Sequence, residues 1–476
     1  MNIIEQSATT LRQLISTKKI SPLEVLDACI DQIKRTDPEI NAFTVTCVDE
    51  ARADAKRVEA QIMAGEDLGL LAGLPLAIKD MSLTKGMRTT FGSLIYENHI
   101  PDHDDLVVEF LREEGAVIYG KTNTTEFGAG NNTTNAVFGP TVNPFDHART
   151  SGGSSGGAAA ALAGNMVPIA TGSDTGGSLR VPATFCGVMS LKPTPGLIPF
   201  ERRIYPFWPF QLQGAMARTI DDVGLLTAAM ARDHSIDPMS YPRDISAFSD
   251  LETVDLKSIR VAFTPDLGFA PTSKMIRRVF DERISKFQSL FGKAEVDHPD
   301  LTTAARVNWV LRGLQYLGSQ KDHFAEHKEK LSPNVRVNYE QALDLTTDDI
   351  AWAFQEHGNL HREMERFFSD YDVLICPGAT VSPFPKEDHF VANIDGEEQA
   401  TYVAWAGLTN ALSTTGNPVV CLPCGKDDEG MPFGFQIVGP RRSDAKMLAI
   451  AKALERVFAD DPELSRPIAS LTESEE

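Results

Sequence analysis

Hydrophobic residues near the N-terminus recur at the spacing of amphipathic helices. Ser21-Pro22-Leu23-Glu24 has the form of a capping box with proline in the first turn, and apolar residues follow at helical spacing as far as Ile33. Asp37-Pro38 is expected to close this helix. A second, more charged stretch at 47–65 predicts another helix. The segment 1–65 is therefore expected to be helical.

Further along the chain, short apolar runs alternate with helical patterns. Leu74–Ile78 is a strand-like run that delivers Lys79 at its end, and a helical pattern over 104–114 and an apolar strand over 115–119 follow it. Similar runs predict strands at 259–263, 373–376, 418–423 and 433–438. This alternation favours an α/β fold.

The length of 476 residues allows one large domain or several. The sequence contains no internal repeat and no long linker, which favours a single domain over 1–476. Within it we distinguish the N-terminal helical segment 1–65, a core at 66–240 that holds the motifs described below, and a less regular helical segment at 265–370.

Composition and charge narrow the possible functions. The net charge of −21 argues against binding to nucleic acids or anionic membranes, because both require basic patches. The start of the chain has no basic segment followed by an apolar core, and the most apolar run is interrupted by Asn165 and Pro168. We therefore expect neither a signal peptide nor a membrane span, and a cytoplasmic protein.

The cysteines do not form a recognisable framework. Six cysteines in so long a chain are too few for a disulfide-stabilised fold. Cys421-Leu-Pro-Cys424 has the spacing of a redox or metal site, but no second pair of ligands accompanies it, and it lies in an apolar, strand-like run. We interpret both as buried structural thiols.

Two glycine-rich turns, each with serines, lie close together in the core segment. The first, at 151–157, reads Ser-Gly-Gly-Ser-Ser-Gly-Gly, and the second, at 172–178, reads Gly-Ser-Asp-Thr-Gly-Gly-Ser. Alone, the first turn would be typical of a flexible linker. The apolar stretch at 158–171 and the second turn favour a buried site that brings two hydroxyl groups together instead.

The second turn has the features of an oxyanion hole. Successive backbone N–H groups in a tight turn can point the same way and bind an anion. Such donors beside a hydroxyl nucleophile stabilise the charge that develops during acyl transfer. We expect the hole to be formed by the amides of Thr175, Gly176, Gly177 and Ser178, with the hydroxyl of Ser178 as the nucleophile.

These turns, together with an upstream lysine, resemble the amidase signature family. Gly152-Gly153-Ser154-Ser155-Gly156-Gly157 precedes Ser178, which lies 24 residues after Ser154, and Gly73-Leu-Pro-Leu-Ala-Ile-Lys79 supplies the lysine. Weaker similarity continues through 119–123 and 434–439. The resemblance implies one large α/β domain whose central mixed, mostly parallel β-sheet carries helices on both faces.

The resemblance also implies a catalytic arrangement of Lys79, Ser154 and Ser178. A hydroxyl needs a base to become a good nucleophile, and no histidine lies in these motifs. A neutral Lys79 can draw the proton of Ser154, which in turn draws that of Ser178. This requires a pKa about 3 below the usual value of about 10.4, which burial can produce. Asp80 would oppose that change, so we expect it to point elsewhere.

Further positions follow from the same resemblance. The peptide bond before the residue that matches Ser154 is cis in the family. Ser155, Asp174 and Arg180 match supporting positions, at which a hydroxyl, a carboxylate and a guanidinium can rigidify the two turns.

Two other classes of site fit the sequence less well. A phosphate-binding loop would require Gly-Lys-Ser/Thr after the glycine cluster, and the chain lacks it. His323 and His327, like His357 and His361, have the spacing of metal ligands on a helix, but neither pair has an acidic residue directly after its first histidine. We expect neither a metal nor a cofactor.

The substrate class separates two hypotheses within the family. The A-type glutaminase subunit of glutamyl-tRNA amidotransferase typically continues after its Lys-Pro-Thr motif with Asp-Gln-Ile-Gly-Pro, whereas this chain reads Phe210-Gln-Leu-Gln213-Gly214-Ala215. This difference favours a hydrolase that acts alone on a small amide, anilide or carbamate with an apolar or aromatic group. The alternative is a glutaminase subunit of a tRNA-dependent amidotransferase. An inactive scaffold would not need to keep the lysine and both serines.

Aromatic residues are the candidates for the substrate pocket, because pockets for apolar groups are lined by aromatic side chains. Helical segment 265–370 is also expected to contribute to the pocket. Look-alikes often form homodimers, although no hydrophobic stripe in this sequence requires one. The six candidate residues are Phe127, Phe138, Tyr205, Phe207, Trp208 and Phe210; the alternative is that they only pack their own loops.

Overall fold

The computed structural model describes residues 1–66 and 69–470, and it is built around one eleven-stranded sheet. The strand order is β1-β3-β2-β6-β8-β7-β14-β15-β11-β9-β10. The strands are β1 (Phe43–Thr46), β2 (Pro75–Lys79), β3 (Val117–Thr122), β6 (Ile169–Asp174), β7 (Met189–Lys192), β8 (Leu212–Ala217), β9 (Arg260–Phe263), β10 (Lys293–Val296), β11 (Val373–Pro377), β14 (Val419–Lys426) and β15 (Pro432–Val438). Residues 67–68 and 471–476, which the predicted domain 1–476 includes, lie outside the described residues.

The sheet is mixed, as expected, but parallel pairs do not predominate. Among the described strands, β2 pairs in parallel with β3 and β6, and β9 with β10 and β11, whereas the other six neighbouring pairs are antiparallel. The expectation of a mostly parallel sheet is therefore wrong. Two of the six antiparallel pairs arise because β8, which the apolar pattern did not reveal, inserts between β6 and β7 and runs opposite to both. The other four join β1 to β3, β7 to β14, β14 to β15 and β15 to β11.

Helices cover both faces of the sheet, as expected. Successive residues of a strand point to opposite faces, so Leu76 and Ile78 of β2 enter a core shared with α1, α4 and α7, while Ala77 packs in the core that contains α5. The helices named below are α1 (Ala8–Ser16), α2 (Pro22–Ile40), α3 (Val48–Ala64), α4 (Leu106–Glu113), α5 (Gly156–Ala163), α6 (Arg180–Phe185), α7 (Ile220–Met230), α9 (Lys274–Phe287), α10 (Ala304–His327), α11 (Pro333–Leu343), α12 (Thr347–Asp370), α13 (Gly407–Thr414) and α14 (Asp444–Ala459).

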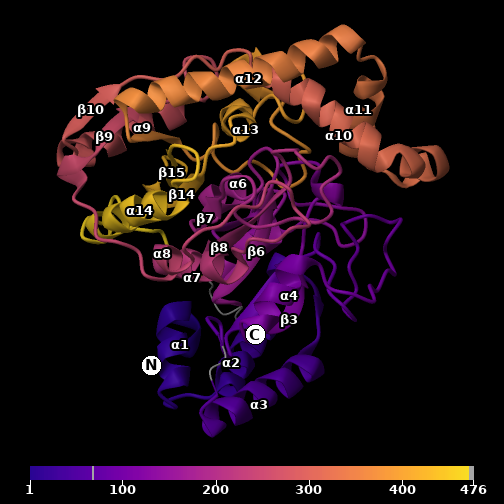
Figure 1. Ribbon diagram of the computed structural model, residues 1–476, viewed down its shortest axis with the longest axis vertical. Coiled ribbons are helices and arrows are strands. Elements are labelled where there is room, and N and C mark those ends of the chain that lie inside the picture. The colour runs from indigo at the N-terminus through magenta and orange to yellow at the C-terminus, as the bar shows by residue number, and fades with distance from the viewer. Residues whose placement is uncertain (67–68, 471–476) are drawn as a thin grey trace.

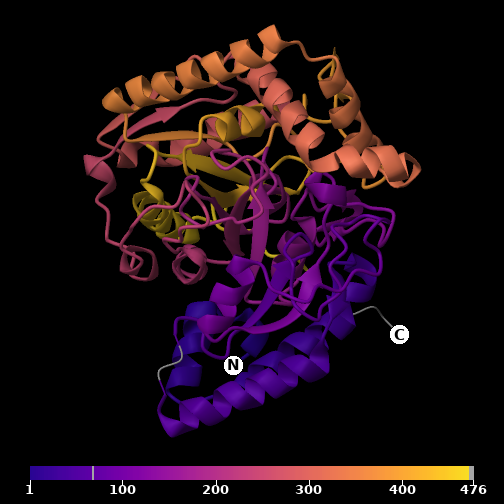
Figure 2. The ribbon, with the colours of Figure 1, turned by 45° about the vertical axis from the view of Figure 1, so that its right-hand side comes forward.

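The two groups of long helices lie at opposite ends of the molecule. The N-terminal helices α1–α3 form one end, and α10, α11 and α12 form the other, with the sheet between them (Figures 1 and 2). Helix α10 packs against α11, α12 and α13. The less regular segment predicted at 265–370 thus contains two helices of 24 residues each, α10 and α12.

Helix α2 begins as its sequence predicts but ends later. Ser21 and Glu24 form the expected capping box, with Pro22 as the first helical residue. The helix continues through Pro38 to Ile40 and ends at Asn41, which adopts a left-handed conformation. Pro38 has no N–H to donate, so the last turn of α2 forms without the helical hydrogen bond of that residue.

The glycine-rich stretch at 151–157 is buried and leads directly into a helix, so it is not a flexible linker. Its last residues begin α5, and that helix passes directly against the chain at Asn123. A Cβ atom on Gly157 would lie 2.3 Å from the backbone nitrogen of Asn123 and 2.6 Å from the carbonyl oxygen of Ala42. Glycine is therefore required for close packing rather than for flexibility.

Cys421 and Cys424 are both buried and unpaired on β14, as expected of structural thiols. Burial raises the pKa of the Cys421 thiol to about 11, which keeps it protonated at neutral pH. The two side chains contribute to different hydrophobic cores.

No helix within residues 1–66 and 69–470 is both long enough and apolar enough to cross a membrane.

Candidate active site

The topology brings the two serine turns and the lysine to one edge of the sheet. Strands β2 and β6 are parallel neighbours, so Lys79 at the end of β2 lies beside Ser173 near the end of β6. The carboxyl ends of parallel strands are where sites collect in α/β proteins. Ser154 and Ser155 directly precede α5 and reach the same place.

The amine of Lys79 lies among three hydroxyl groups. Its Nζ is 2.7 Å from Ser154 Oγ, 2.9 Å from Ser155 Oγ and 2.9 Å from Ser173 Oγ. The side chain is completely buried, and no carboxylate of a described residue lies within ion-pair distance of it. Burial lowers the pKa of Lys79 to about 7, against the opposing charge of Asp174. Near neutral pH, much of this amine is therefore uncharged.

Asp80 points away from this amine, as expected. Its carboxylate accepts hydrogen bonds from the backbone and side chain of Thr90 and lies 3.8 Å from the amine of Lys121. Burial raises the pKa of Asp80, and Lys121 opposes that change. The acidic neighbour of Lys79 thus stabilises a different lysine.

The hydrogen bonds around Lys79 limit which hydroxyl can donate a proton to it. A neutral amine keeps two N–H donors and one lone pair, so it can accept one hydrogen bond. The hydroxyl of Ser155 donates to the carbonyl oxygen of Ser173 at 3.3 Å and therefore accepts from the amine. The hydroxyls of Ser154 and Ser173 each contact only this amine among the described residues, so either can donate to the lone pair.

Ser173 is a site residue that the sequence reasoning missed. It precedes Asp174 in the second turn, and its hydroxyl both contacts Lys79 and lines the cavity described below. The signal available in the sequence was its place in the second serine-bearing turn. The pairing of β2 with β6, which makes the contact possible, is not visible in the sequence.

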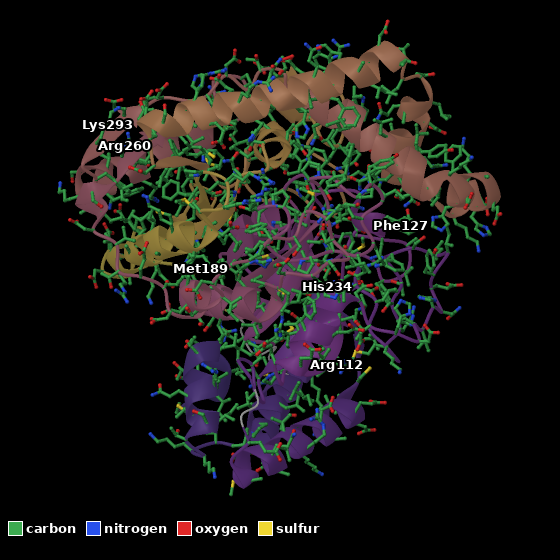
Figure 3. The ribbon with its side chains drawn as sticks, viewed as in Figure 1. Arg112, Phe127, Met189, His234, Arg260 and Lys293 are labelled. Carbon is green, nitrogen blue, oxygen red and sulfur yellow. The ribbon has the colours of Figure 1, made fainter. Side chains whose placement is uncertain are left out.

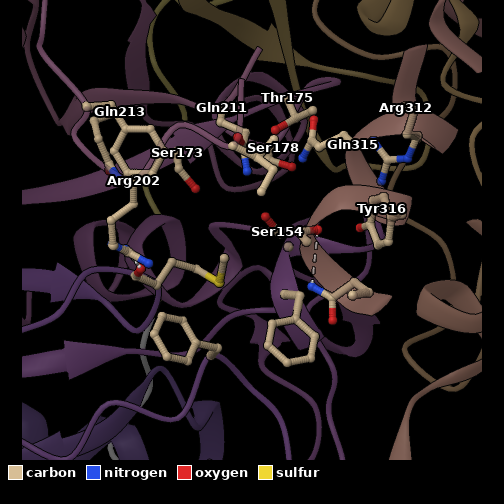
Figure 4. A pocket seen from close by; sticks show the side chains of 18 of the residues that line it. Ser154, Ser173, Thr175, Ser178, Arg202, Gln211, Gln213, Arg312, Gln315 and Tyr316 are labelled. Atoms are coloured by element: carbon tan, nitrogen blue, oxygen red, sulfur yellow. Dashed lines mark hydrogen bonds between the residues drawn. The ribbon is translucent and has the colours of Figure 1, made fainter. Parts of the chain in front are cut away.

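Ser154 and Ser178 both line a cavity of about 240 Å³. Figure 4 shows their hydroxyl groups on facing sides of the same space. Ser178 is 6% exposed, and its Oγ forms no hydrogen bond with any described residue. The peptide bond between Gly153 and Ser154 is cis, as the family resemblance implies. The first link of the predicted proton relay is thus formed, while the hydroxyl of Ser178 is open to the cavity.

The turn after β6 offers fewer free amides than the sequence suggested. The N–H of Gly177 donates to Asp174 at 2.8 Å, and that of Leu179 donates to the same carboxylate at 3.0 Å. The amides of Thr175, Gly176 and Ser178 donate to no described protein group. The expected oxyanion hole therefore retains three available donors, and Gly177 supports the turn instead.

Asp174 and Arg180 form a buried, two-pronged ion pair beneath this turn. The guanidinium contacts the two carboxylate oxygens at 3.1 and 3.0 Å and also donates to Gln436 Oε1 and the carbonyl of Thr409. Burial would raise the pKa of Asp174, but Arg180 and the backbone donors outweigh it and hold that pKa below its usual value. Both expected supporting residues thus connect the turn to α13 and β15.

One predicted aromatic residue, Phe127, lines the cavity together with Ser154 and Ser178. It lies beside the C-terminal part of α10 (Figure 3) and stacks on His323, with ring centroids 5.3 Å apart. Phe91 and Tyr96, which the sequence reasoning missed, line the cavity and contact its ring. Together Phe91, Tyr96 and Phe127 form an aromatic wall.

The other five predicted aromatic residues do not line this cavity. Phe138 packs under Arg88 in a different loop, and Phe207 is 76% exposed. Trp208 donates to Gln315 Oε1 at 3.1 Å, and Tyr205 and Phe210 join it in the core around α10 and α12. The 205–210 loop therefore packs against α10, where Tyr205 donates to the carbonyl oxygen of Leu314 and Trp208 to the side chain of Gln315.

One face of α10 forms a wall of the cavity, which residue types alone did not indicate. The lining residues recur at intervals of three and four, the spacing of a single helical face. A polar helix face is usually exposed to solvent, and only the packing of α10 across the site turns this face inward. These residues are Arg312, Gln315, Tyr316, Ser319, Gln320 and His323.

The histidine pairs have other partners than a metal. His323 lies 3.0 Å from the hydroxyl of Tyr96 and 2.9 Å from Gln320 Oε1, and His357 contacts the carbonyl of Thr414 at 2.8 Å. Among the described residues, no group of three potential ligands could hold a metal ion.

This chain is similar to known proteins in both sequence and structure. A protein-family model described as Amidase matches residues 24–448. An acylamidase from Rhodococcus erythropolis is 31% identical over 453 residues, 95% of each protein. A glutamyl-tRNA(Gln) amidotransferase subunit from Clostridium acetobutylicum is 30% identical over 484 residues, covering 96% of this chain and 100% of that protein. The crystal structure of a bacterial aryl acylamidase of the amidase signature enzymes superimposes with a TM-score of 0.89 at 27% identity, covering 96% of each chain.

The buried ion pair beneath the turn predicts a large effect on stability. Arg180→Met keeps much of the side-chain volume but leaves the charge of Asp174 buried without its partner. We expect a loss of about 3–5 kcal/mol in the free energy of unfolding, measured by urea denaturation. The control is Arg278→Met, which removes exposed pairs with Glu282 and Asp428 and should cost about 0–1 kcal/mol. Equal losses in the two variants would contradict the role of the buried pair.

Proposed function

Because this chain belongs to the amidase family, whose members cleave carbon–nitrogen bonds of amides, we propose that Ser178 attacks the amide carbonyl and forms an acyl-enzyme. The observation that carries the proposal is the 2.7 Å contact between the buried amine of Lys79 and the hydroxyl of Ser154. A hydroxyl is activated by an adjacent base, and a lysine with its pKa lowered to about 7 can act as one near neutral pH.

Acylation follows from these positions. The lone pair of Lys79 Nζ takes the proton of Ser154, while Ser154 takes that of Ser178, whose oxygen bonds to the carbonyl carbon. The resulting oxyanion is stabilised by the amides of Thr175, Gly176 and Ser178. When the C–N bond breaks, the same protons pass back along the relay to the leaving nitrogen, which departs as a neutral amine.

Deacylation repeats the relay with water in place of the amine. The water gives a proton through Ser154 to Lys79 as its oxygen attacks the ester carbonyl. Collapse of the second tetrahedral intermediate breaks the bond to Ser178 Oγ, which recovers its proton. The products are a carboxylic acid and an amine, and the enzyme returns to its starting state.

The substrate we propose is a small amide with an aromatic or apolar group, hydrolysed without partner subunits. The aromatic wall of Phe91, Tyr96 and Phe127 supports this substrate class, as does similarity to an acylamidase and an aryl acylamidase. A glutaminase subunit is the second candidate, because an amidotransferase subunit is nearly as similar. Homodimer formation stays a prediction.

Activity should depend on pH through Lys79. The amine acts as a base only when neutral, and its pKa is about 7. We therefore expect kcat/KM to rise about tenfold per pH unit below pH 7 and to level off above it. A pH profile with a neutral anilide, extended to the Lys79→Met variant, measures this. The residual activity of that variant should not rise with pH around pH 7. If the activity of the native enzyme rose instead around pH 10, a lowered pKa of Lys79 would be contradicted.

Covalent labelling should identify the nucleophile. A fluorophosphonate is expected to add to Ser178 alone, and mass spectrometry of peptides locates the adduct. Ser178→Ala should abolish labelling, and Ser154→Ala should slow it by at least about 100-fold because the relay is broken. The exposed Ser285 offers a control, since Ser285→Ala should label at the native rate. An adduct that persists in Ser178→Ala would overturn the assignment.

Turnover of two amides separates the two candidate functions. The purified chain should hydrolyse acetanilide or benzamide with a higher kcat/KM than glutamine, because the aromatic wall is suited to a ring. Liquid chromatography of the products measures both reactions. Preference for glutamine, or glutaminase activity that appears only with co-purifying partners, would favour the amidotransferase role instead.

A further inference from the structure

Arg312 is a buried cation on the wall of the active-site cavity. It lies on α10, is 6% exposed and lines the same cavity as Ser154 and Ser178. Its Nε is 2.9 Å from Asn338 Oδ1 and 3.0 Å from the hydroxyl of Tyr402, and its Nη2 is 2.5 Å from that hydroxyl. These neutral groups hold the guanidinium in one position.

No carboxylate of a described residue lies within 4 Å of this guanidinium. Arg202, which lines the opposite side of the cavity, is by contrast paired with Asp105 at 2.6 Å. The buried carboxylate of Glu126, beside Phe127, is occupied by Ser93 Oγ and the amide of Ser332. A buried charge is costly unless it is paired. Arg312 lacks a counter-ion from the protein, and an anionic ligand in the cavity could provide one.

The unused donors of Arg312 are arranged for a carboxylate. A guanidinium has five N–H donors. Those of Nη1 make no hydrogen bond of 3.5 Å or less with an acceptor in a described residue, while the ring and hydroxyl of Tyr316 lie close to the guanidinium. The two N–H groups of Nη1 and the second N–H of Nη2 therefore remain at the end of the side chain. Two parallel donors at that end match the two oxygens of a carboxylate, a geometry that lysine does not offer.

This free end lies next to the catalytic turn. Nη1 is 3.8 Å from the position that a Cβ atom would occupy on Gly176, one of the proposed oxyanion donors. Figure 4 shows Arg312 and Tyr316 on one side of Ser178 and Arg202 on the other. The aromatic wall lies instead near His323, which is 11 residues further along α10 and so about 16 Å away along its axis.

We propose that Arg312 binds a carboxylate on the acyl part of the substrate, so that the preferred substrates are monoamides of short dicarboxylic acids with an aromatic or apolar amine. The proposal rests on amide hydrolysis at Ser178. The acyl carbonyl must approach the amides of the turn, and Arg312 is the unpaired cation at that end of the cavity. The aromatic wall then receives the amine.

A matched pair of substrates tests this directly. Succinanilic acid and butyranilide share the anilide bond and differ by a terminal carboxylate. We expect the native enzyme to have the higher kcat/KM for succinanilic acid. Arg312→Gln should reduce that preference by about 10- to 100-fold, chiefly through KM, as expected for loss of a hydrogen bond to a charged group. Arg312→Lys keeps the charge but not the paired donors, so its preference for succinanilic acid should lie between those of the native enzyme and Arg312→Gln.

Arg306 provides the control variant. It lies on the same helix, but its side chain is 62% exposed and pairs with Asp349 on the surface. Arg306→Gln should leave the preference for succinanilic acid unchanged. If Arg312→Gln and Arg312→Lys instead lowered kcat/KM equally for both anilides, Arg312 would only support the packing of α10, and the proposal would be wrong. A native preference for butyranilide would also overturn it.

A binding measurement separates this proposal from the proposed reaction. Succinanilic acid is titrated calorimetrically into Ser178→Ala and into Ser178→Ala with Arg312→Lys or Arg312→Gln, after thermal unfolding has confirmed that each variant is folded. We expect the Arg312 substitutions to raise Kd by about 10- to 100-fold. Binding that depends on Arg312 without hydrolysis by the native enzyme would refute the reaction and not the carboxylate site. Absent binding, or binding indifferent to Arg312, would refute the site.

Discussion

The burial of one amine among hydroxyl groups is the constraint on which the site depends. Lys79 ends a strand that is buried along its whole length, so its amine is removed from water. Desolvation disfavours the charged form, and the three surrounding serine hydroxyls can exchange hydrogen bonds with a neutral amine. An ion-pair partner in their place would hold the amine protonated and unable to accept a proton. The proposed relay therefore requires that Nζ has no ion-pair partner, and no carboxylate in the described part of the chain lies within ion-pair distance of it.

The glycine turns place the serine hydroxyls at the amine because glycine lets the turns pack closely against neighbouring chain segments. Gly157 permits α5 to pass against the chain at Asn123, and this places the serines before α5 next to Lys79. The second turn is fixed from below by Asp174, whose two oxygens hold the amides of residues 177 and 179. Arg180 in turn holds Asp174. A turn fixed in this way holds its remaining amides in place, so that in the proposed mechanism they need no rearrangement to stabilise a developing charge.

Much of this centre could be predicted from the sequence because its motifs are local. The glycine and serine pattern and the lysine at a strand end are recognised by resemblance to a family, and the expected orientation of Asp80 follows from its charge. Long-range packing decides the rest. The insertion of β8 between β6 and β7 reverses two strand pairings, and nothing in a single strand reveals its neighbours. The 205–210 loop is aromatic because it packs behind α10, and the polar face of that helix, which forms the cavity wall, has the pattern of a solvated surface.

A lowered pKa does not by itself identify the catalytic lysine, because two other buried lysines share it. Burial lowers the pKa of Lys121 to about 8 and that of Lys192 to about 7. The amine of Lys121 is held by Ser82, Thr84 and Thr89 and lies near Asp80, and that of Lys192 donates to the carbonyl of Asn417. Neither residue lines the cavity that holds Ser178. Lys79 is distinguished by geometry, since it alone of the three contacts a hydroxyl that faces the proposed nucleophile across that cavity. In the proposed mechanism, desolvation makes Lys79 a base, and Ser154 is placed to give that base a proton.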